Sequence, residues 1–220
     1  MRPAFLALAA LAAVLPFPAA AQDDGHPEAV IVDRTTGCAV RDRYPYPTKE
    51  VRWHGVCRHG FADGRGVLAW GENGIEEGRA EGTFVQGSLE GDGRATWADG
   101  RRYTGSFRRG LAEGWGTFVW PDGQRYEGEW RADARTGTGT LFFPNGSRYV
   151  GRFDRNRPTN GEFIAPDGQR FVAAVDSEGS IGPGAPVKEP TRNTPVQSAE
   201  MPPPAPPPET LDEWLRQPPP

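Results

Sequence analysis

Apolar and polar residues alternate with a period of two through the middle of the chain. In one stretch, Tyr103, Gly105 and Phe107 fall on one face, and the residues between them are polar. Such alternation is typical of a β-strand with one buried face. The same order of residues returns further along the chain, so the pattern predicts a series of strands.

The alternating pattern repeats with a period of about 23 residues, set by Tyr103, Tyr126 and Tyr149, each of which follows an arginine. Pro-Asp-Gly or Pro-Asn-Gly closes each of these units, and this order of residues suits a tight turn. Each unit is therefore predicted to be a β-hairpin. The residues that define the repeat are Trp53, Tyr103, Gly105, Gly114, Gly116, Tyr126, Gly128, Gly137, Gly139, Tyr149 and Gly151.

Weaker copies extend the repeat to five units and a partial sixth. Ala80 replaces the leading aromatic residue of one unit, and Asp133 replaces a glycine inside another. The copy that follows Tyr149 is one residue short, and we expect its hairpin tip to have lost that residue. Glycine weakens a strand unless something packs against it, so we expect a large ring from a neighbouring strand to lie across each bare glycine backbone.

The predicted fold class is all-β, an elongated single-layer antiparallel meander of hairpin repeats with a disordered proline-rich tail. Of the 29 glycines, 24 lie between residues 55 and 168, whereas 13 of the 23 prolines lie between residues 183 and 220. We therefore assign residues 22–50 to a capping segment, 51–175 to the repeat sheet and 176–220 to the tail. Two strands per unit would lengthen the sheet by about 10 Å per repeat.

The first residues predict export, and export bears on the two cysteines. Residues 1–21 combine Arg2, an apolar run and small residues before Gln22, as in a signal peptide cleaved near Ala21, which implies a periplasmic or secreted protein. In an exported chain, Cys38 and Cys57 most simply form a disulfide. The alternative is a metal site built from Cys57, His54 and His59, although these three residues do not have the spacing of known zinc sites.

These residues resemble the membrane occupation and recognition nexus (MORN) repeat, with its Tyr-x-Gly-x-aromatic start and later Gly-x-Gly. The resemblance covers residues 53–168. The segments 37–40 and 53–57 also look like the lead-in of exported bacterial MORN proteins, which supports the disulfide. The resemblance implies a non-enzymatic, elongated β-sheet used for contacts with proteins or membranes.

Charge narrows the choice of partner. The chain has a formal charge of −4, which disfavours nucleic acid. Residues 51–171 contain 17 arginines and 16 acidic residues, so their net charge favours a protein partner over an anionic lipid surface. Glu127 and Glu129 could form an acid and base pair, but Arg125 and Arg131 on the same face favour a solvated ladder of ion pairs. We therefore assign no catalytic residue, no cofactor and no metal ligand.

Two segments are candidate partner-binding regions. The first is a set of apolar residues on the polar side of the strands, where they either form a docking patch or reflect β-propensity alone. These residues are Trp115, Val119, Phe142, Val150 and Ile164. The second is a short helix near residues 210–217, with Leu211, Trp214 and Leu215 on one stripe. Such a peptide would bind either the protein's own patch or another protein.

Overall fold

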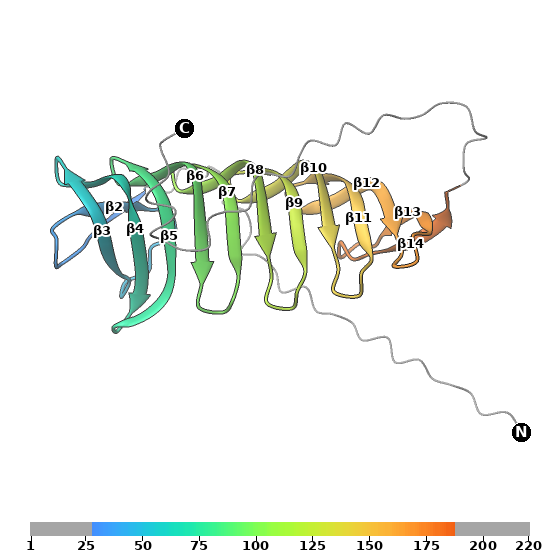
Figure 1. The fold of residues 1–220 in the computed structure, drawn as a ribbon, viewed down its shortest axis with the longest axis horizontal. Coiled ribbons are helices and arrows are strands. Elements are labelled where there is room, and N and C mark those ends of the chain that lie inside the picture. Colours follow the sequence, from blue (N-terminus) through green and yellow to red (C-terminus); the bar gives the residue numbers. More distant parts are fainter. Residues whose placement is uncertain (1–27, 188–220) are drawn as a thin grey trace, which may run out of the picture.

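The computed structural model describes residues 28–187, which form one 14-stranded β-sheet drawn out along its long axis (Figure 1). The described part contains no helix, and therefore none that could cross a membrane. The strands are β1 (Ala29–Val32), β2 (Ala39–Asp42), β3 (Glu50–Arg58), β4 (Phe61–Glu72), β5 (Ile75–Val85), β6 (Ser88–Trp97), β7 (Arg102–Arg108), β8 (Leu111–Val119), β9 (Arg125–Arg131), β10 (Ala134–Phe142), β11 (Arg148–Asp154), β12 (Arg157–Ile164), β13 (Arg170–Val175) and β14 (Ile181–Pro186).

The predicted meander is confirmed from β3 to β14, where each strand pairs antiparallel with the next. At the N-terminal end the order differs, because β2 makes a single parallel pair with β4, between Ala39 and Phe61. The tail boundary also differs from the prediction. Residues 181–186, expected to be disordered, form β14 and pair with β13.

Two-residue turns with both residues at positive φ form the hairpin tips at one end of the strands. Both positions are left-handed in residues 59–60, 86–87, 109–110, 132–133 and 155–156, as in a type I′ turn. Each of these tips is also connected to the hairpin before it by a backbone hydrogen bond. The N–H of Gly110 donates to the Leu89 carbonyl at 2.9 Å, and the N–H of Asp133 donates to the Ala112 carbonyl at 3.1 Å.

Asp133 does more at its tip than the glycine it replaces. Its carboxylate accepts the N–H of Ala112 at 2.6 Å, so donor and acceptor of Ala112 are both satisfied by one residue of the next hairpin. Asn156 repeats this arrangement with Arg135 one unit later. The departure from glycine therefore strengthens the joint between units and leaves the sheet regular.

The short unit after Tyr149 keeps its tip, so the prediction of a shortened tip was wrong. In the β7–β8 pair, Gly105 and Phe107 are two positions apart, but their partners on β8, Gly116 and Ala112, are four positions apart. In the β11–β12 pair, the corresponding partners on β12, Gly161 and Pro158, are only three positions apart. The missing residue belongs to this bulge. Bulge residues are unpaired, so the deletion leaves the ladder intact.

One face of the sheet, which we call the aromatic face, packs rings over glycines. The Tyr126 ring lies across Gly139 on the neighbouring strand, where an added Cβ would be 2.6 Å from Tyr126 Cζ. The Tyr126 hydroxyl also lies close to Gly128 on its own strand, which the sequence analysis did not predict. The hydroxyl of Tyr126 donates to the Glu129 carbonyl at 3.2 Å. The ring contacts Trp130 on its own strand, and its contact with Phe153 on β11 connects this unit to the next.

Candidate interaction surface

The opposite face, which we call the polar face, is where the candidate contact residues were predicted. Trp115 and Val150 are exposed, at 37 % and 40 % of their full surface. Val119 and Phe142 are half-buried. Ile164 is only 9 % exposed, so its assignment as an accessible contact residue was wrong.

Strand register explains why these side chains do not form one apolar patch. Ile164 lies directly between Arg148 and Arg170, whose long aliphatic stems can cover an apolar neighbour. Phe142 lies between Arg125 and Arg148, and the guanidinium of Arg125 sits 4.2 Å from the centre of its ring. The apolar residues are therefore interleaved with arginines.

Six exposed arginines stand in register across the polar face, and we call them the arginine row. Directly paired residues share a face, and the pairs run without interruption from β3 to β13, alternating arginine with Ala69, Thr96, Val119, Phe142 and Ile164. One arginine falls on every second strand, so neighbours are about 10 Å apart. The row consists of Arg52, Arg79, Arg102, Arg125, Arg148 and Arg170.

Half of the arginine row is engaged by acidic residues. Arg79 pairs with Glu76 at 2.7 Å, Arg125 with Glu127 at 3.1 Å, and Arg170 with Glu162. Within residues 28–187, Arg52, Arg102 and Arg148 have no ion-pair partner. The interpretation of the arginines as partners for neighbouring acids thus holds for three of them and leaves three cations for another ligand.

The sequence analysis noted three of these arginines and missed the row. The available signal was that arginine precedes the leading residue of every unit, including those led by Trp53, Ala80 and Phe171. Four extra residues separate the first two units. The structure places them in a longer β4–β5 hairpin, so Arg52 and Arg79 stay in register through Ala69.

Arg135 lies among the rings of the aromatic face, and the repeat pattern did not predict a charged residue there. The guanidinium of Arg135 lies 5.6 Å from the ring centres of Trp120 and Tyr126 and 5.3 Å from that of Phe153. Its Nη2 donates to the Asn156 carbonyl at 2.9 Å. Burial among the rings lowers the pKa of Arg135 to about 10. These contacts make Arg135 part of the packing between units.

The segment from β2 to the start of β3 follows the hairpin tips and reaches far along the sheet. Arg41 donates its backbone N–H to the Gly87 carbonyl at 2.9 Å, and the Tyr44 hydroxyl donates to Asp133 Oδ2 at 2.6 Å. Burial raises the pKa of Asp133, although hydrogen bonds from Tyr44 and Ala112 act in the opposite direction. This segment therefore braces units that lie up to 89 residues away in the chain.

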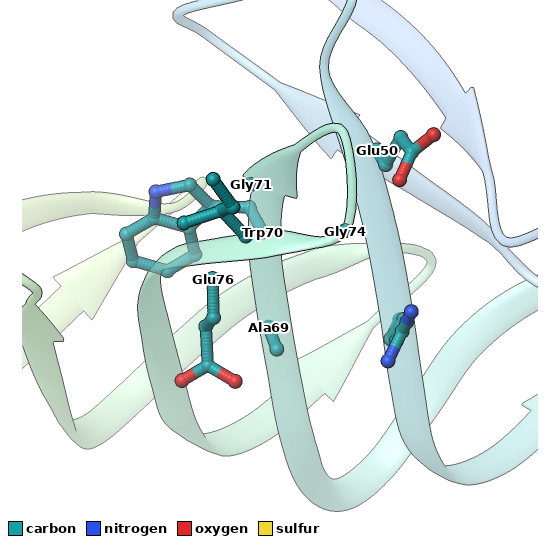
Figure 2. Close-up of a pocket in the computed structure, with 8 residues that line it drawn as sticks. Glu50, Ala69, Trp70, Gly71, Gly74 and Glu76 are labelled. Atoms are coloured by element: carbon teal, nitrogen blue, oxygen red, sulfur yellow. The ribbon is translucent and has the colours of Figure 1, made fainter.

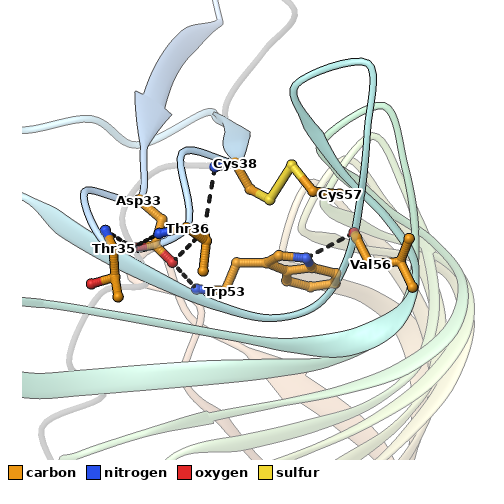
Figure 3. The surroundings of a disulfide bond; sticks show 7 residues. All are labelled: Asp33, Thr35, Thr36, Cys38, Trp53, Val56 and Cys57. Atoms are coloured by element: carbon orange, nitrogen blue, oxygen red, sulfur yellow. Dashed lines mark hydrogen bonds between the residues drawn. A yellow bond between two sulfur atoms is a disulfide. The ribbon is translucent and has the colours of Figure 1, made fainter.

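A disulfide joins Cys38 to Cys57, as predicted, with a Cα–Cα distance of 5.7 Å (Figure 3). The alternative metal site at Cys57 is therefore wrong, because its sulfur is already bonded. Within the described residues, no group of three or more histidine, cysteine, aspartate or glutamate side chains could hold a metal ion.

The buried carboxylate of Asp33 lies in the turn between β1 and β2 and holds that turn against β3. It accepts the N–H groups of Trp53 and Thr35 and the Thr36 hydroxyl, each at 2.8 Å. Burial raises the pKa of Asp33, but these hydrogen bonds outweigh it and hold the pKa below its ordinary value. Asp33 thus satisfies a backbone donor on the side of β3 that pairs with no full strand.

A shallow hollow lies at the β4–β5 turn, between Glu50, Trp70 and Glu76 (Figure 2). Its volume is about 40 Å³, whereas small-molecule sites usually measure about 300–1,000 Å³.

Glu127 and Glu129, considered above as an acid and base pair, have different partners. Glu127 pairs with Arg125, while hydrogen bonds from Thr138 lower the pKa of Glu129.

A family model described as MORN repeat matches residues 81–101, 103–125 and 126–148. Residues 81–148 of the chain are therefore three consecutive MORN repeats. The matched MORN units span β5 to β10, the central part of the arginine row. A comparison with curated proteins found no match. MORN repeats are in general non-catalytic modules that contact proteins or membranes.

Two predicted regions fall outside the described residues 28–187. They are the signal peptide at residues 1–21 and the helix near residues 210–217 with Leu211, Trp214 and Leu215. The disulfide is described, and disulfides are typical of oxidising compartments.

Proposed function

We propose that this protein is an exported, non-catalytic scaffold that binds a protein partner through the polar face of its MORN sheet. The observation that carries the proposal is the arginine row, in which cations recur about every 10 Å, with apolar Val119 and Phe142 between the arginines of its central part. Such a surface fits an extended partner segment with acidic groups at a matching interval. The C-terminal Trp214 peptide is a second contact point in this proposal.

Export follows from the predicted signal peptide, with cleavage near Ala21, and is supported by the disulfide. We place the protein in a bacterial periplasm or outside the cell. In the mature chain, residues 22–50 would cap the sheet, 51–175 would form the binding surface, and the tail would follow.

Crosslinking in the native envelope, followed by mass spectrometry, tests the proposal. The variant Arg102→Gln/Arg125→Gln/Arg148→Gln should lose partners that the wild type captures. The control Arg108→Gln/Arg131→Gln/Arg155→Gln removes the same charge from exposed positions near the hairpin tips. Each set also breaks one ion pair, Arg125 with Glu127 or Arg108 with Glu113. Identical captured proteins for wild type and row variant would refute the proposal.

Trp214→Ala tests the tail as the second contact point in the same experiment. If the captured proteins are unchanged, the Trp214 peptide is not a recognition element.

The arginine row also supports a second candidate, peripheral contact with an anionic membrane surface, because aligned cations attract acidic headgroups. Co-sedimentation with vesicles that contain anionic lipid, against vesicles of neutral lipid alone, separates the two. A membrane-binding protein should pellet with the anionic vesicles and be released as salt rises. A protein-binding scaffold should stay in the supernatant with both.

A further inference from the structure

We propose that the chain's own C-terminal segment, residues 188–220, lies along the arginine row and covers the polar face. The inference rests on the proposed function, because it names what controls access to the same surface. The segment acts as a tethered competitor, and a partner must displace it in order to bind.

The chain leaves the sheet at the end of the row. The N–H of Val187, the last described residue, donates to the Arg170 carbonyl at 3.0 Å. A further 33 residues follow. Six arginines about 10 Å apart make a row of about 50 Å. A polyproline II chain, which rises about 3.1 Å per residue, needs about 16 residues to cover that length. The segment starts at the right place and is long enough.

The spacing of acidic residues in the segment matches the row. Glu200 and Glu209 are nine residues apart, and six of the eight residues between them are proline. Proline-rich sequence favours polyproline II, so the two glutamates would be about 28 Å apart and on the same side of a three-residue turn. Three intervals of the row measure about 29 Å. Both glutamates can therefore meet arginines three units apart.

Charge and apolar contacts are complementary as well. Residues 200–220 contain four acidic residues and one arginine. Arg102 and Arg148 have no ion-pair partner within residues 28–187. Between the arginines, Val119 and Phe142 offer half-buried apolar surface to proline rings. Aromatic-lined surfaces between polar groups are a common way to bind polyproline II segments.

The tether makes weak contacts sufficient. A segment attached next to its site has an effective concentration of millimolar order. A proline-rich chain is already extended, so it loses little conformational freedom when it binds. The exposed ion pairs are screened by salt, so raising the salt concentration should release the segment.

A nitroxide spin label in the segment tests the contact by nuclear magnetic resonance of the full chain. Ala205 is the one non-proline residue within 202–208. Cys38 and Cys57 are bonded to each other, so Ala205→Cys provides a free thiol for the label. We expect loss of signal for backbone amides along the polar-face arginines, and recovery of that signal at high salt. Signal loss that is absent, or spread evenly over the sheet, would overturn the proposal.

Matched variants identify the cause of the signal loss. It should disappear in Arg102→Gln/Arg125→Gln/Arg148→Gln and in Glu200→Gln/Glu209→Gln, and persist in Arg108→Gln/Arg131→Gln/Arg155→Gln. Persistence in the row variant would overturn the proposal. A mixture of spin-labelled chains and separate isotope-labelled chains should show no signal loss. Signal loss in that mixture would also overturn the proposal, because the contact would then be between molecules.

The outcome is distinguishable from that of the proposed function. If the row variant loses captured partners but the spin label shows no contact, only this inference fails. If the spin label shows the contact but the row variant captures the same proteins, the proposed function fails. When both hold, Glu200→Gln/Glu209→Gln should increase partner capture, because the competitor is weakened.

Discussion

Replacing Gly139 by alanine tests the packing of rings over glycine. An added Cβ would lie 2.6 Å from Tyr126 Cζ, well inside ordinary contact distance, and backbone strain does not contribute because Gly139 is not left-handed. Overpacking of this kind costs about 1–3 kcal/mol. Loss of the Tyr126 hydroxyl bond adds about 1 kcal/mol. Alanine recovers about 0.5–1 kcal/mol of strand propensity. The net expected loss is about 1–3 kcal/mol.

Thermal and urea unfolding of four chains measure this effect: wild type, Gly139→Ala, Tyr126→Ala and the double variant. A loss of about 1–3 kcal/mol corresponds to a drop in Tm of about 2–12 °C for a chain of this size. With the ring removed, Gly139→Ala should be neutral or slightly stabilising. Gly182→Ala is the control, since no atom lies within 4 Å of its added Cβ. Equal losses with and without the Tyr126 ring would refute the reasoning.

Three further predictions follow from the described contacts. Thiol titration of the unreduced protein should find no free cysteine, and Cys38→Ser/Cys57→Ser should lower the free energy of unfolding by about 3 kcal/mol, as expected for a loop of this length. Because the pKa of Asp33 is lowered on folding, its contribution should be complete above the unfolded value of about 3.9 and be lost as the pH falls toward the folded value. Asp33→Asn should flatten that acid limb of the stability curve, and an unchanged limb would contradict the assignment. Tyr103→Phe removes a hydroxyl bond to the Ser106 carbonyl at 3.0 Å and should cost about 1 kcal/mol in urea unfolding; a neutral effect would remove the hydroxyl from the account of the repeat.

The strands were predictable because they depend on local order. Alternation places Tyr103 and Phe107 on one face, and the Pro-Asp-Gly turns return the chain beside itself. The long-range braces were not predictable. Tyr44 meets Asp133 across 89 residues, and neither position shows a periodic pattern that would indicate a partner. The missing residue of the last full unit was assigned to the hairpin tip instead of the bulge of β12. The sequence alone does not distinguish the two places, because only the pairing register shows which residue is absent.

The sequence predicted which face carries the candidate contact residues but not how exposed each of them is. The sequence placed Phe142 and Ile164 on the polar face correctly, but exposure depends on what stands on the adjacent strands. Arginine stems flank both residues, so Ile164 is covered and Phe142 is half-covered. Net charge also did not reveal the arginine row. A total near zero conceals six cations that the strand register aligns.

The joints between hairpins have a consequence for how such a chain can vary in length. Gly87, Gly110, Asp133 and Asn156 each donate their backbone N–H to a carbonyl of the hairpin before them, so these joints share one backbone hydrogen bond whatever the side chain adds. Duplicating residues 103–125 would insert a unit whose two ends match those already present. The duplication would add one arginine to the arginine row and about 10 Å to the length of the sheet. Gain or loss of whole repeats can therefore change the length of the sheet in steps of about 10 Å.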